Sequence, residues 1–294
     1  MDDLEQATDL QRRLYHELAS AEMFVHVRAH LGLLTALLDG LQTDRLRPRI
    51  AAAAAEAAGF AAWLWLDLGD LFRAQSLYRD ASAAVGEAGD RGLGAYIRGY
   101  QGIIAARSEG PGHALTYLRE ASRMGRGSLS GTTRSWLTVL EAETLARTGQ
   151  PESAVAALGR AEELLAEGEA VSDPWMYDFD QGSLAAHAGN CYLAVDQPGR
   201  AAESFEDALR FLPAPCDRRG ARISVGLARA RLAIGDGEEA LRLASAALTT
   251  FATRGSVAGV HEVWDLRGEF AQAGLGGAAS ALDEHARALG RPAG

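Results

Sequence analysis

The sequence contains no lysine, so all 29 of its basic residues are arginines. This absence excludes the phosphate-binding lysine of a P-loop, Schiff-base lysines and the lysine-dependent kinase signature. Only two cysteines are present, Cys191 and Cys216, and they lack the spacing of a metal site. We therefore expect structural thiols in a reducing compartment, with a disulfide or a reactive thiol as the alternatives.

Signal-peptide features and long apolar runs are missing as well. The N-terminus is acidic, and the most apolar run, 51–66, is interrupted by Glu56 and Gly59. A formal net charge of −10 argues against non-specific binding to the nucleic-acid backbone. These features predict a cytoplasmic protein that binds neither membranes nor nucleic acid directly.

One stretch, 182–213, is close to the tetratricopeptide (TPR) pattern of two packed helices. Its small residue, its two aromatics and its terminal proline are Gly189, Tyr192, Phe205 and Pro213. The small residue lets the helices approach, the aromatics fill the space between them, and proline ends the second helix. It departs from the pattern where alanine replaces the preferred Trp and Leu, at Ala185 and Ala188.

The same arrangement recurs along the chain as pairs of alanines seven residues apart. The pairs are Ala74/Ala81, Ala114/Ala121, Ala154/Ala161, Ala201/Ala208 and Ala240/Ala247. Twelve residues before each pair stands a small residue: Ala62, Gly102, Ala142, Gly189 and Ala228. A turn signal separates each small residue from its alanine pair, which predicts five helix-turn-helix units.

This register predicts an all-α fold, a right-handed α-superhelix of TPR-like helix pairs with about fourteen helices. We expect a single solenoid over 1–294, because stacked repeats share one continuous core. Capping helices occupy 1–43, five TPR-like repeats occupy 44–254, and a C-terminal cap occupies 255–294. The segment 168–180 is an insert that carries Trp175, Tyr177 and Phe179. It is interpreted either as a lid over a groove or as a plug in an irregular helix junction.

Four runs resemble the C-terminal TPR half of actinobacterial regulators that carry an N-terminal XRE-type helix-turn-helix. They are RRLYH at 12–16, AAWLWLDLGD at 61–70, EAGD at 87–90 and DPWMYDFD at 173–180. The resemblance implies that the repeats sense a signal or a partner. No DNA-binding module precedes Leu4 in this sequence. We therefore expect no direct DNA binding, either because the module was lost or because the sequence was cut from a longer protein.

Enzyme motifs are not found. The run His261-Glu262-x-x-Asp265 could place two metal ligands on one helix face, but no third ligand is apparent in the sequence. Asp178 and Asp180 stand at a helix start, where N-capping is a sufficient role. We predict no catalytic residue, no metal and no cofactor.

The residue pattern favours binding over catalysis. In TPR proteins the first helix of each pair lines the concave groove, and the repeat register assigns residues to that groove. They are Trp63, Tyr96, Arg107, Trp136, Glu143, Arg147, Asn190, Arg222 and Arg229, with Trp264 added from the last pair. Trp, Tyr and Arg dominate binding hot spots. The alternative is that the aromatics pack between helices and the charges are solvated.

A second choice concerns the arginines of 218–231, which either meet a partner's carboxylates or pair with Glu203, Glu206, Glu238 and Glu239.

We predict a recognition protein whose partner is a peptide, a protein segment or a small-molecule signal. Two other classes stay open. One is a scaffold that forms a homodimer or holds a pathway enzyme. The other is an enzyme with acidic residues and His187 in a closed cavity beneath the insert.

Overall fold

The computed structural model describes residues 1–15, 18–40, 42–167, 173–176, 179–212 and 218–290. Within these ranges the chain forms fourteen α-helices and no strand, which confirms the predicted all-α fold. The helices are α1 (Asp2–Leu14), α2 (Ser20–Asp39), α3 (Arg47–Asp67), α4 (Leu71–Ala88), α5 (Arg91–Ser108), α6 (Pro111–Met124), α7 (Gly131–Arg147), α8 (Pro151–Ala166), α9 (Gln181–Ala194), α10 (Pro198–Arg210), α11 (Arg218–Ala233), α12 (Gly237–Arg254), α13 (Val257–Gln272) and α14 (Gly276–Ala288).

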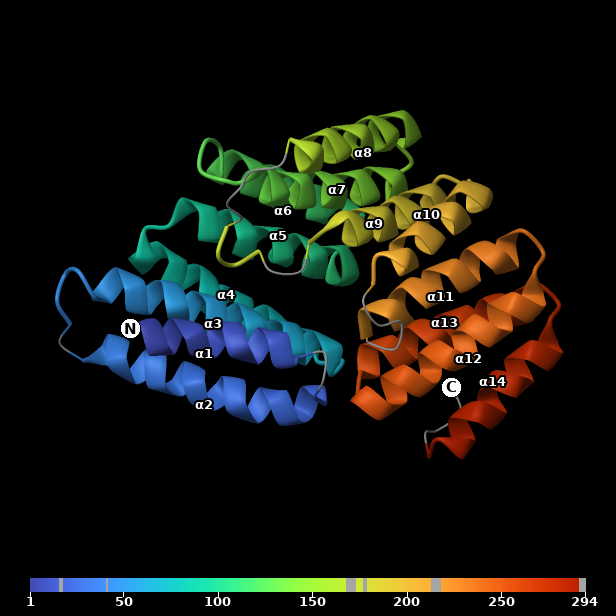
Figure 1. Cartoon of the computed structure of the whole chain (residues 1–294), viewed down its shortest axis with the longest axis horizontal. Coiled ribbons are helices and arrows are strands. Elements are labelled where there is room, and N and C mark those ends of the chain that lie inside the picture. The colour runs from blue at the N-terminus through green and yellow to red at the C-terminus, as the bar shows by residue number, and fades with distance from the viewer. Residues whose placement is uncertain (16–17, 41, 168–172, 177–178, 213–217, 291–294) are drawn as a thin grey trace.

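Consecutive helices pack as pairs, from α3 with α4 to α11 with α12, and the pairs stack into a solenoid (Figure 1). The alanine register accounts for this packing. All ten paired alanines, on α4, α6, α8, α10 and α12, are at most 1% exposed. A methyl side chain lets two helix backbones approach closely at little cost in conformational entropy. The assignment of 1–43 and 255–294 as caps stays a prediction.

Phe205 shows how an aromatic ring fills the space between neighbouring helices. Its side chain is 1% exposed and lies against Gly189 on α9 and Gly226 on α11. A Cβ atom added at Gly189 would lie 2.7 Å from the ring, and one at Gly226 would lie 2.5 Å from it. Glycine is therefore required at both positions, because the ring occupies the volume of the missing methyl groups.

Two of the turns within the pairs use a glycine followed by a capping aspartate. Gly69 and Gly235 adopt φ values of +82° and +88°. The next residues, Asp70 and Asp236, accept backbone hydrogen bonds from the first turns of α4 and α12. In the turn before α10 the glycine position is occupied by Asp196, which adopts φ +58°. This is a left-handed conformation that residues with a Cβ atom adopt at a cost.

Two helices, α2 and α3, are long and apolar enough by length and composition to cross a membrane. This differs from the expectation that no segment approaches that length. In α3, 78% of the apolar window is buried within the protein, so its composition matches a core helix. In α2 the buried share is 22%, and this helix packs against α1 and α3. The predicted absence of membrane binding stays a prediction.

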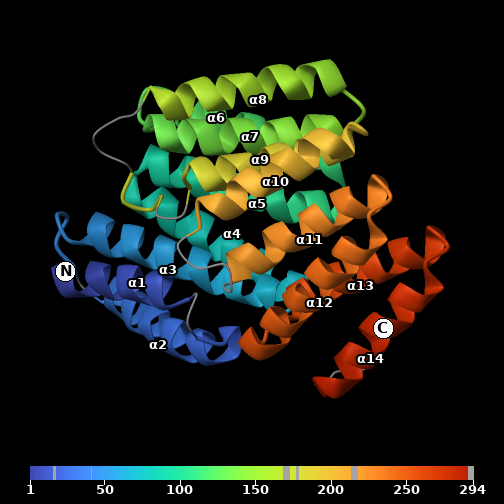
Figure 2. The same ribbon diagram turned by 45° about the vertical axis from the view of Figure 1, so that its right-hand side comes forward.

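The two ends of the solenoid meet. α13 packs against α3, and Figures 1 and 2 show the blue N-terminal helices beside the orange-red C-terminal helices. The contact centres on Asp67, at the end of α3, whose side chain is 1% exposed. Its carboxylate accepts hydrogen bonds from Ser20 Oγ at 2.5 Å and from Ser256 Oγ at 2.6 Å.

Two arginines of α11 complete this contact. Arg218 is 1% exposed, and its Nε lies 3.7 Å from Asp67 Oδ2. It also donates to the backbone carbonyls of Leu18 and Arg254 at 2.7 Å each. Arg222 donates to Asp67 Oδ1 at 3.3 Å. We call Ser20, Asp67, Arg218, Arg222 and Ser256 the latch, because together they join α2 and α3 to α11 and α13.

Candidate functional site

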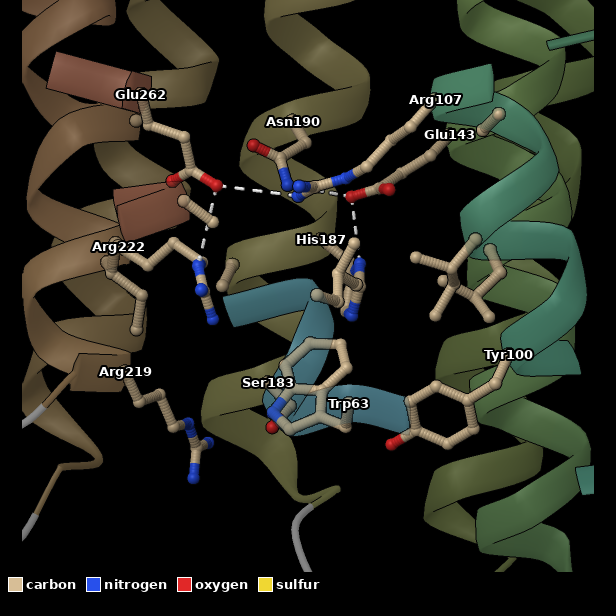
Figure 3. A pocket seen from close by; sticks show the side chains of 18 of the residues that line it. Trp63, Tyr100, Arg107, Glu143, Ser183, His187, Asn190, Arg219, Arg222 and Glu262 are labelled. Atoms are coloured by element: carbon tan, nitrogen blue, oxygen red, sulfur yellow. Dashed lines mark hydrogen bonds and ion pairs between the residues drawn. The ribbon is translucent and has the colours of Figure 1, made fainter. Parts of the chain in front are cut away.

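The closed solenoid surrounds a cavity of about 810 Å³. Its wall is built mainly from α3, α5, α7, α9 and α11, the first helices of the pairs, together with α13. Figure 3 shows this wall, with side chains from these helices converging on one space. Nine of the ten groove residues predicted from the repeat register line the cavity: Trp63, Tyr96, Arg107, Trp136, Glu143, Arg147, Asn190, Arg222 and Arg229.

The tenth residue, Trp264, is placed elsewhere. It is half-buried on α13 and packs against the core formed by the C-terminal helices. The residues of α13 that line the cavity are Ala258, His261, Glu262 and Asp265. The register of the last pair therefore presents a polar and charged face to the cavity rather than its tryptophan.

An aromatic wall forms one side of the cavity, and Tyr100 lies at its centre. The Tyr100 ring centroid is 4.9 Å from that of Tyr96, 5.1 Å from that of Trp136 and 5.7 Å from that of Trp63. Tyr96 and Trp136 are only 6% and 5% exposed. These rings therefore pack between helices and also face the cavity. Their role in binding stays a prediction.

Trp136 packs closely against α5. A Cβ atom added at Gly99 would lie 2.6 Å from the Trp136 ring and 2.8 Å from Leu137. The tryptophan is therefore a structural residue of the α5–α7 interface, as well as part of the aromatic wall.

About two helical turns along α7 from Trp136, Glu143 holds two neighbouring polar groups of α9. Its Oε1 atom accepts a hydrogen bond from Asn190 Nδ2 at 2.7 Å, and His187 Nδ1 donates to the same oxygen at 2.8 Å (Figure 3). Burial raises the pKa of Glu143, but His187, Arg147 and Asn190 favour the carboxylate and bring the pKa below its ordinary value of 4.5. The ionised carboxylate thereby orients the imidazole and the amide within the cavity.

Three arginines from three helices form a group that we call the arginine cluster: Arg107, Arg147 and Arg222. Arg107 Nη2 lies 3.4 Å from Glu262 Oε1, and Arg222 Nε lies 3.6 Å from the same oxygen. Burial lowers the pKa of Arg107, and the like charges of Arg222 and Arg147 lower it further, against the raising effect of Glu262. These guanidinium groups are thus close enough to repel one another within a partly desolvated space.

The remaining arginines of α11 pair with carboxylates of the same chain. Arg219 pairs with Asp180, Arg229 with Glu269 at 2.8 Å, and Arg231 with Glu206. The sequence suggested four carboxylates as partners of these arginines. Within the described residues, only one of the four, Glu206, contacts an arginine of α11. Intramolecular pairing accordingly accounts for most of this basic face, through partners far away in the sequence.

The insert has two parts that the structure describes. Trp175 is 8% exposed and packs against Gly92 in the core of the N-terminal half, which matches a plug. Phe179 lines the cavity, and its ring centroid is 6.2 Å from that of His187. Asp173 anchors the insert by accepting hydrogen bonds from Ser130 at the start of α7. Tyr177 lies outside the described residues, and a lid role for this segment stays a prediction.

Groups that could carry chemistry were located in the same way. Among the described residues, no group of three His, Cys, Asp or Glu side chains could hold a metal ion. Cys191 is a buried free thiol whose pKa burial raises, and Cys216 lies outside the described residues. Asp180 caps α9 by accepting from Ser183 N at 2.8 Å, as expected, and Asp178 is outside the described residues. His187 and Glu143 do meet in the cavity, as the enzyme alternative requires.

Some lining residues were not predicted from the sequence. Tyr100 follows Tyr96 by four residues, so helical spacing placed it on the same face. Arg219 and Ser183 also line the cavity. Ser183 precedes Asn190 by seven residues, as Trp136 precedes Glu143, so the repeat register could have found it, whereas Arg219 lies outside that spacing. Tyr15 lines it from the turn after α1, and only the closure of the solenoid brings it there.

No family model matches the chain, and no curated protein has a similar sequence. Solved structures do share its fold. A Rap protein complexed with Competence and Sporulation Factor aligns over 98% of this chain and 78% of its own, with a TM-score of 0.62 and 11% identity. BtubC (BKLC) from P. vanneervenii aligns over 80% of this chain and 92% of its own, with a TM-score of 0.52 and 18% identity.

A third similar structure is a signal transduction ATPase with numerous domains, with a tetratricopeptide repeat sensor, from Pyrococcus horikoshii. It aligns over 92% of this chain with a TM-score of 0.55 and 15% identity, and the match covers 40% of its length. At these identities the likeness concerns the fold alone. The chain has the TPR-like fold of helical-repeat solenoids.

Proposed function

We propose that this protein is a non-catalytic regulatory sensor that binds a signal in its central cavity. The signal is a peptide, a protein segment or a small metabolite, and binding changes how the solenoid contacts a partner. Transcription would be influenced indirectly, through a separate DNA-binding component, and the protein would act in the cytoplasm. The transcriptional step follows from the resemblance to the regulator family and not from the cavity itself.

The observation that supports this proposal is the convergence of nine groove residues on one cavity. A cavity of about 810 Å³ lies within the range of roughly 300–1,000 Å³ that ligand sites occupy. Its wall combines aromatic rings with guanidinium, carboxylate, imidazole and amide groups from six helices. The Rap structure was determined with Competence and Sporulation Factor bound, which supports partner recognition by this type of fold.

Thermal unfolding in the presence of metabolite and peptide pools tests the proposal. A ligand at 100 times its dissociation constant adds about 2.7 kcal/mol to the free energy of unfolding. Replacing Trp136 is unsuitable, because this core side chain is 5% exposed and its loss costs about 3–5 kcal/mol by itself. Ala186→Phe is the better variant, since half-buried Ala186 lines the cavity and a phenyl ring would occupy part of it.

The matched control is Ala156→Phe, at an exposed position of α8 that does not line the cavity. We expect at least one pool to raise the unfolding temperature of the wild type and of the Ala156→Phe variant, but not that of the Ala186→Phe variant. A stabilising pool that acts equally on all three proteins would contradict binding in the cavity.

A second candidate function is that of a scaffold, and exposed apolar side chains favour it. Leu10 on α1 is 53% exposed, and Val25 and Leu33 on α2 are 55% and 50% exposed. Exposed apolar groups of this size occur at protein interaction surfaces. Light scattering of the wild type and of the Val25→Glu variant tests self-association. A homodimer that the glutamate dissociates would support the scaffold, and a monomeric wild type would contradict dimerisation through α2.

A further inference from the structure

We propose that the ligand of the cavity is a small aromatic anion, a flat apolar body that carries a carboxylate or a similar oxyanion. This inference rests on the proposed function and specifies the chemical class of the signal. It follows from the charges of the wall, from hydrogen-bond donors that are not used within the protein, and from the position of the aromatic wall beside them.

The side chains that line the cavity are mostly basic, whereas the whole protein is acidic. The chain carries 39 acidic and 29 basic residues, which gives a formal net charge of −10. The cavity is lined by six arginines and three carboxylates: Arg107, Arg147, Arg218, Arg219, Arg222 and Arg229, with Glu143, Glu262 and Asp265. Three carboxylates behind the wall, Asp67, Asp180 and Glu269, pair with four of these arginines, because Asp67 contacts two of them. An acidic protein has thus gathered guanidinium groups on its inner face.

The arginine cluster retains unused donors. Arg147 is exposed to the cavity, and no described residue forms an ion pair or a hydrogen bond with it. Arg107 and Arg222 share Glu262 at 3.4 and 3.6 Å, longer than the roughly 2.7–2.9 Å of tight charge-assisted hydrogen bonds. Glu143 is already committed to Asn190 and His187. An oxyanion between these guanidinium groups would therefore meet several donors and reduce their mutual repulsion.

The aromatic wall lies next to this cluster. The Arg222 guanidinium lies over the Trp63 ring, 5.7 Å from its centroid, so the charged and the aromatic surfaces meet at this pair. Trp63 in turn contacts Tyr100, which connects it to Trp136. Planar ligands gain from stacking or edge contacts with such rings. The juxtaposition fits a molecule with an anionic group at one end and a flat apolar body at the other.

The closure of the solenoid favours a small molecule over a peptide. The latch joins α3 to α11 and α13, and its residues Arg218 and Arg222 also line the cavity. An extended peptide along the inner face would have to pass this contact. A compact ligand needs only the space that the closed form provides, about 810 Å³.

The experiment uses two fluorescent probes of similar shape on the full chain. 1-Anilinonaphthalene-8-sulfonate is an anion, and N-phenyl-1-naphthylamine is its uncharged counterpart. Both are titrated against the wild type and the Arg147→Gln variant, whose replaced side chain is exposed and unpaired in the described structure. The matched control is Arg160→Gln, at an exposed arginine of α8 that does not line the cavity. The Ala186→Phe variant reports whether the probes occupy the cavity.

We expect one site per chain for the anion, and Arg147→Gln should weaken its binding by about tenfold, the loss of one hydrogen bond to a charged group. Binding of the neutral probe should change less than twofold in this variant, and Arg160→Gln should alter neither probe. Anion binding to Arg147→Gln with wild-type affinity would overturn the inference. A competition experiment gives a second test, in which a tryptophan-terminated hexapeptide and naphthalene-1-sulfonate each displace the anionic probe. Stronger displacement by the hexapeptide would also overturn the inference, because the site would then accept a peptide terminus.

The proposed function can fail separately. If both probes bind the wild type equally and Ala186→Phe removes both, the cavity is a ligand site without anion preference. If both probes bind the Ala186→Phe variant as they bind the wild type, and the pools still stabilise this variant, the cavity is not a ligand site at all.

Discussion

Replacing Asp67 by asparagine should destabilise the protein strongly and open the solenoid. The Asp67 carboxylate is 1% exposed and is the only acidic group of the latch, where it faces Arg218 and Arg222. Asparagine has nearly the same shape but no charge. The substitution would leave Arg218, which is also 1% exposed, without its counter-ion in the interior.

The size of the loss in unfolding free energy can be worked out from these contacts. Breaking a buried ion pair by removing one partner costs about 3–5 kcal/mol, because the other charge is left uncompensated. Arg218 keeps its hydrogen bonds to the carbonyls of Leu18 and Arg254, so the cost lies near the lower end. Ser20 and Ser256 can still donate to the asparagine side-chain oxygen, although no longer to two separate carboxylate oxygens. We expect a loss of about 3 kcal/mol for Asp67→Asn.

The assay is urea unfolding followed by far-UV circular dichroism, together with small-angle scattering of the native state. The control is Asp70→Asn, three residues further on, where the carboxylate caps α4 by accepting from Arg73 N at 2.9 Å. Asparagine caps helices about as well as aspartate, so this change should stay within about 0.5 kcal/mol of the wild type. Equal unfolding free energies for the two variants, with unchanged radii of gyration, would refute the role assigned to the latch.

Three further predictions concern packing, backbone strain and protonation. Gly99→Ala should destabilise the protein by about 1–3 kcal/mol, because its methyl group would meet the Trp136 ring. Gly268→Ala, in open space on α13, should instead stabilise it by roughly 0.5–1 kcal/mol. Thermal unfolding of both variants measures these changes, and a change of the same sign in both would contradict the packing argument. Asp196→Gly should stabilise by about 0.5–1 kcal/mol, since glycine adopts the left-handed turn without strain; a lower midpoint of urea unfolding would count against this. Because the folded pKa of Glu143 is below 4.5, its stabilising contribution is fully present above pH 4.5 and is lost as pH falls through the folded pKa. Unfolding free energies across this acidic range should therefore fall more steeply for the wild type than for Glu143→Gln, and parallel curves would show that Glu143 contributes nothing.

The repeat organisation could be predicted because it is written in local spacing. Alanines such as Ala74 and Ala81 stand on one helix face, and the turn before each pair marks where the chain reverses. Nine of the ten residues that the same register assigns to a groove line the cavity, because the first helix of each pair faces it. Their role in binding stays a prediction. The insertion at 168–180 was visible as a break in that period.

The latch could not be predicted in this way. Asp67 and Arg218 are 151 residues apart, and no local spacing relates the two positions. Whether the ends of a superhelix meet depends on small rotations summed over every repeat, which the sequence of any one repeat does not reveal. For the same reason the sequence predicted Arg222 as a groove residue but could not indicate that one guanidinium contacts both Asp67 and Glu262.

Closure of the solenoid also bears on how the chain folds and frays. In an open repeat array each unit contacts only its neighbours, so folding can spread from any unit and the terminal units open first. Here α3 cannot reach its full set of contacts until α11 and α13 have formed, which adds interactions of very large sequence separation. Amide hydrogen exchange should then protect α3 and α13 to a similar degree, as parts of one cooperative unit.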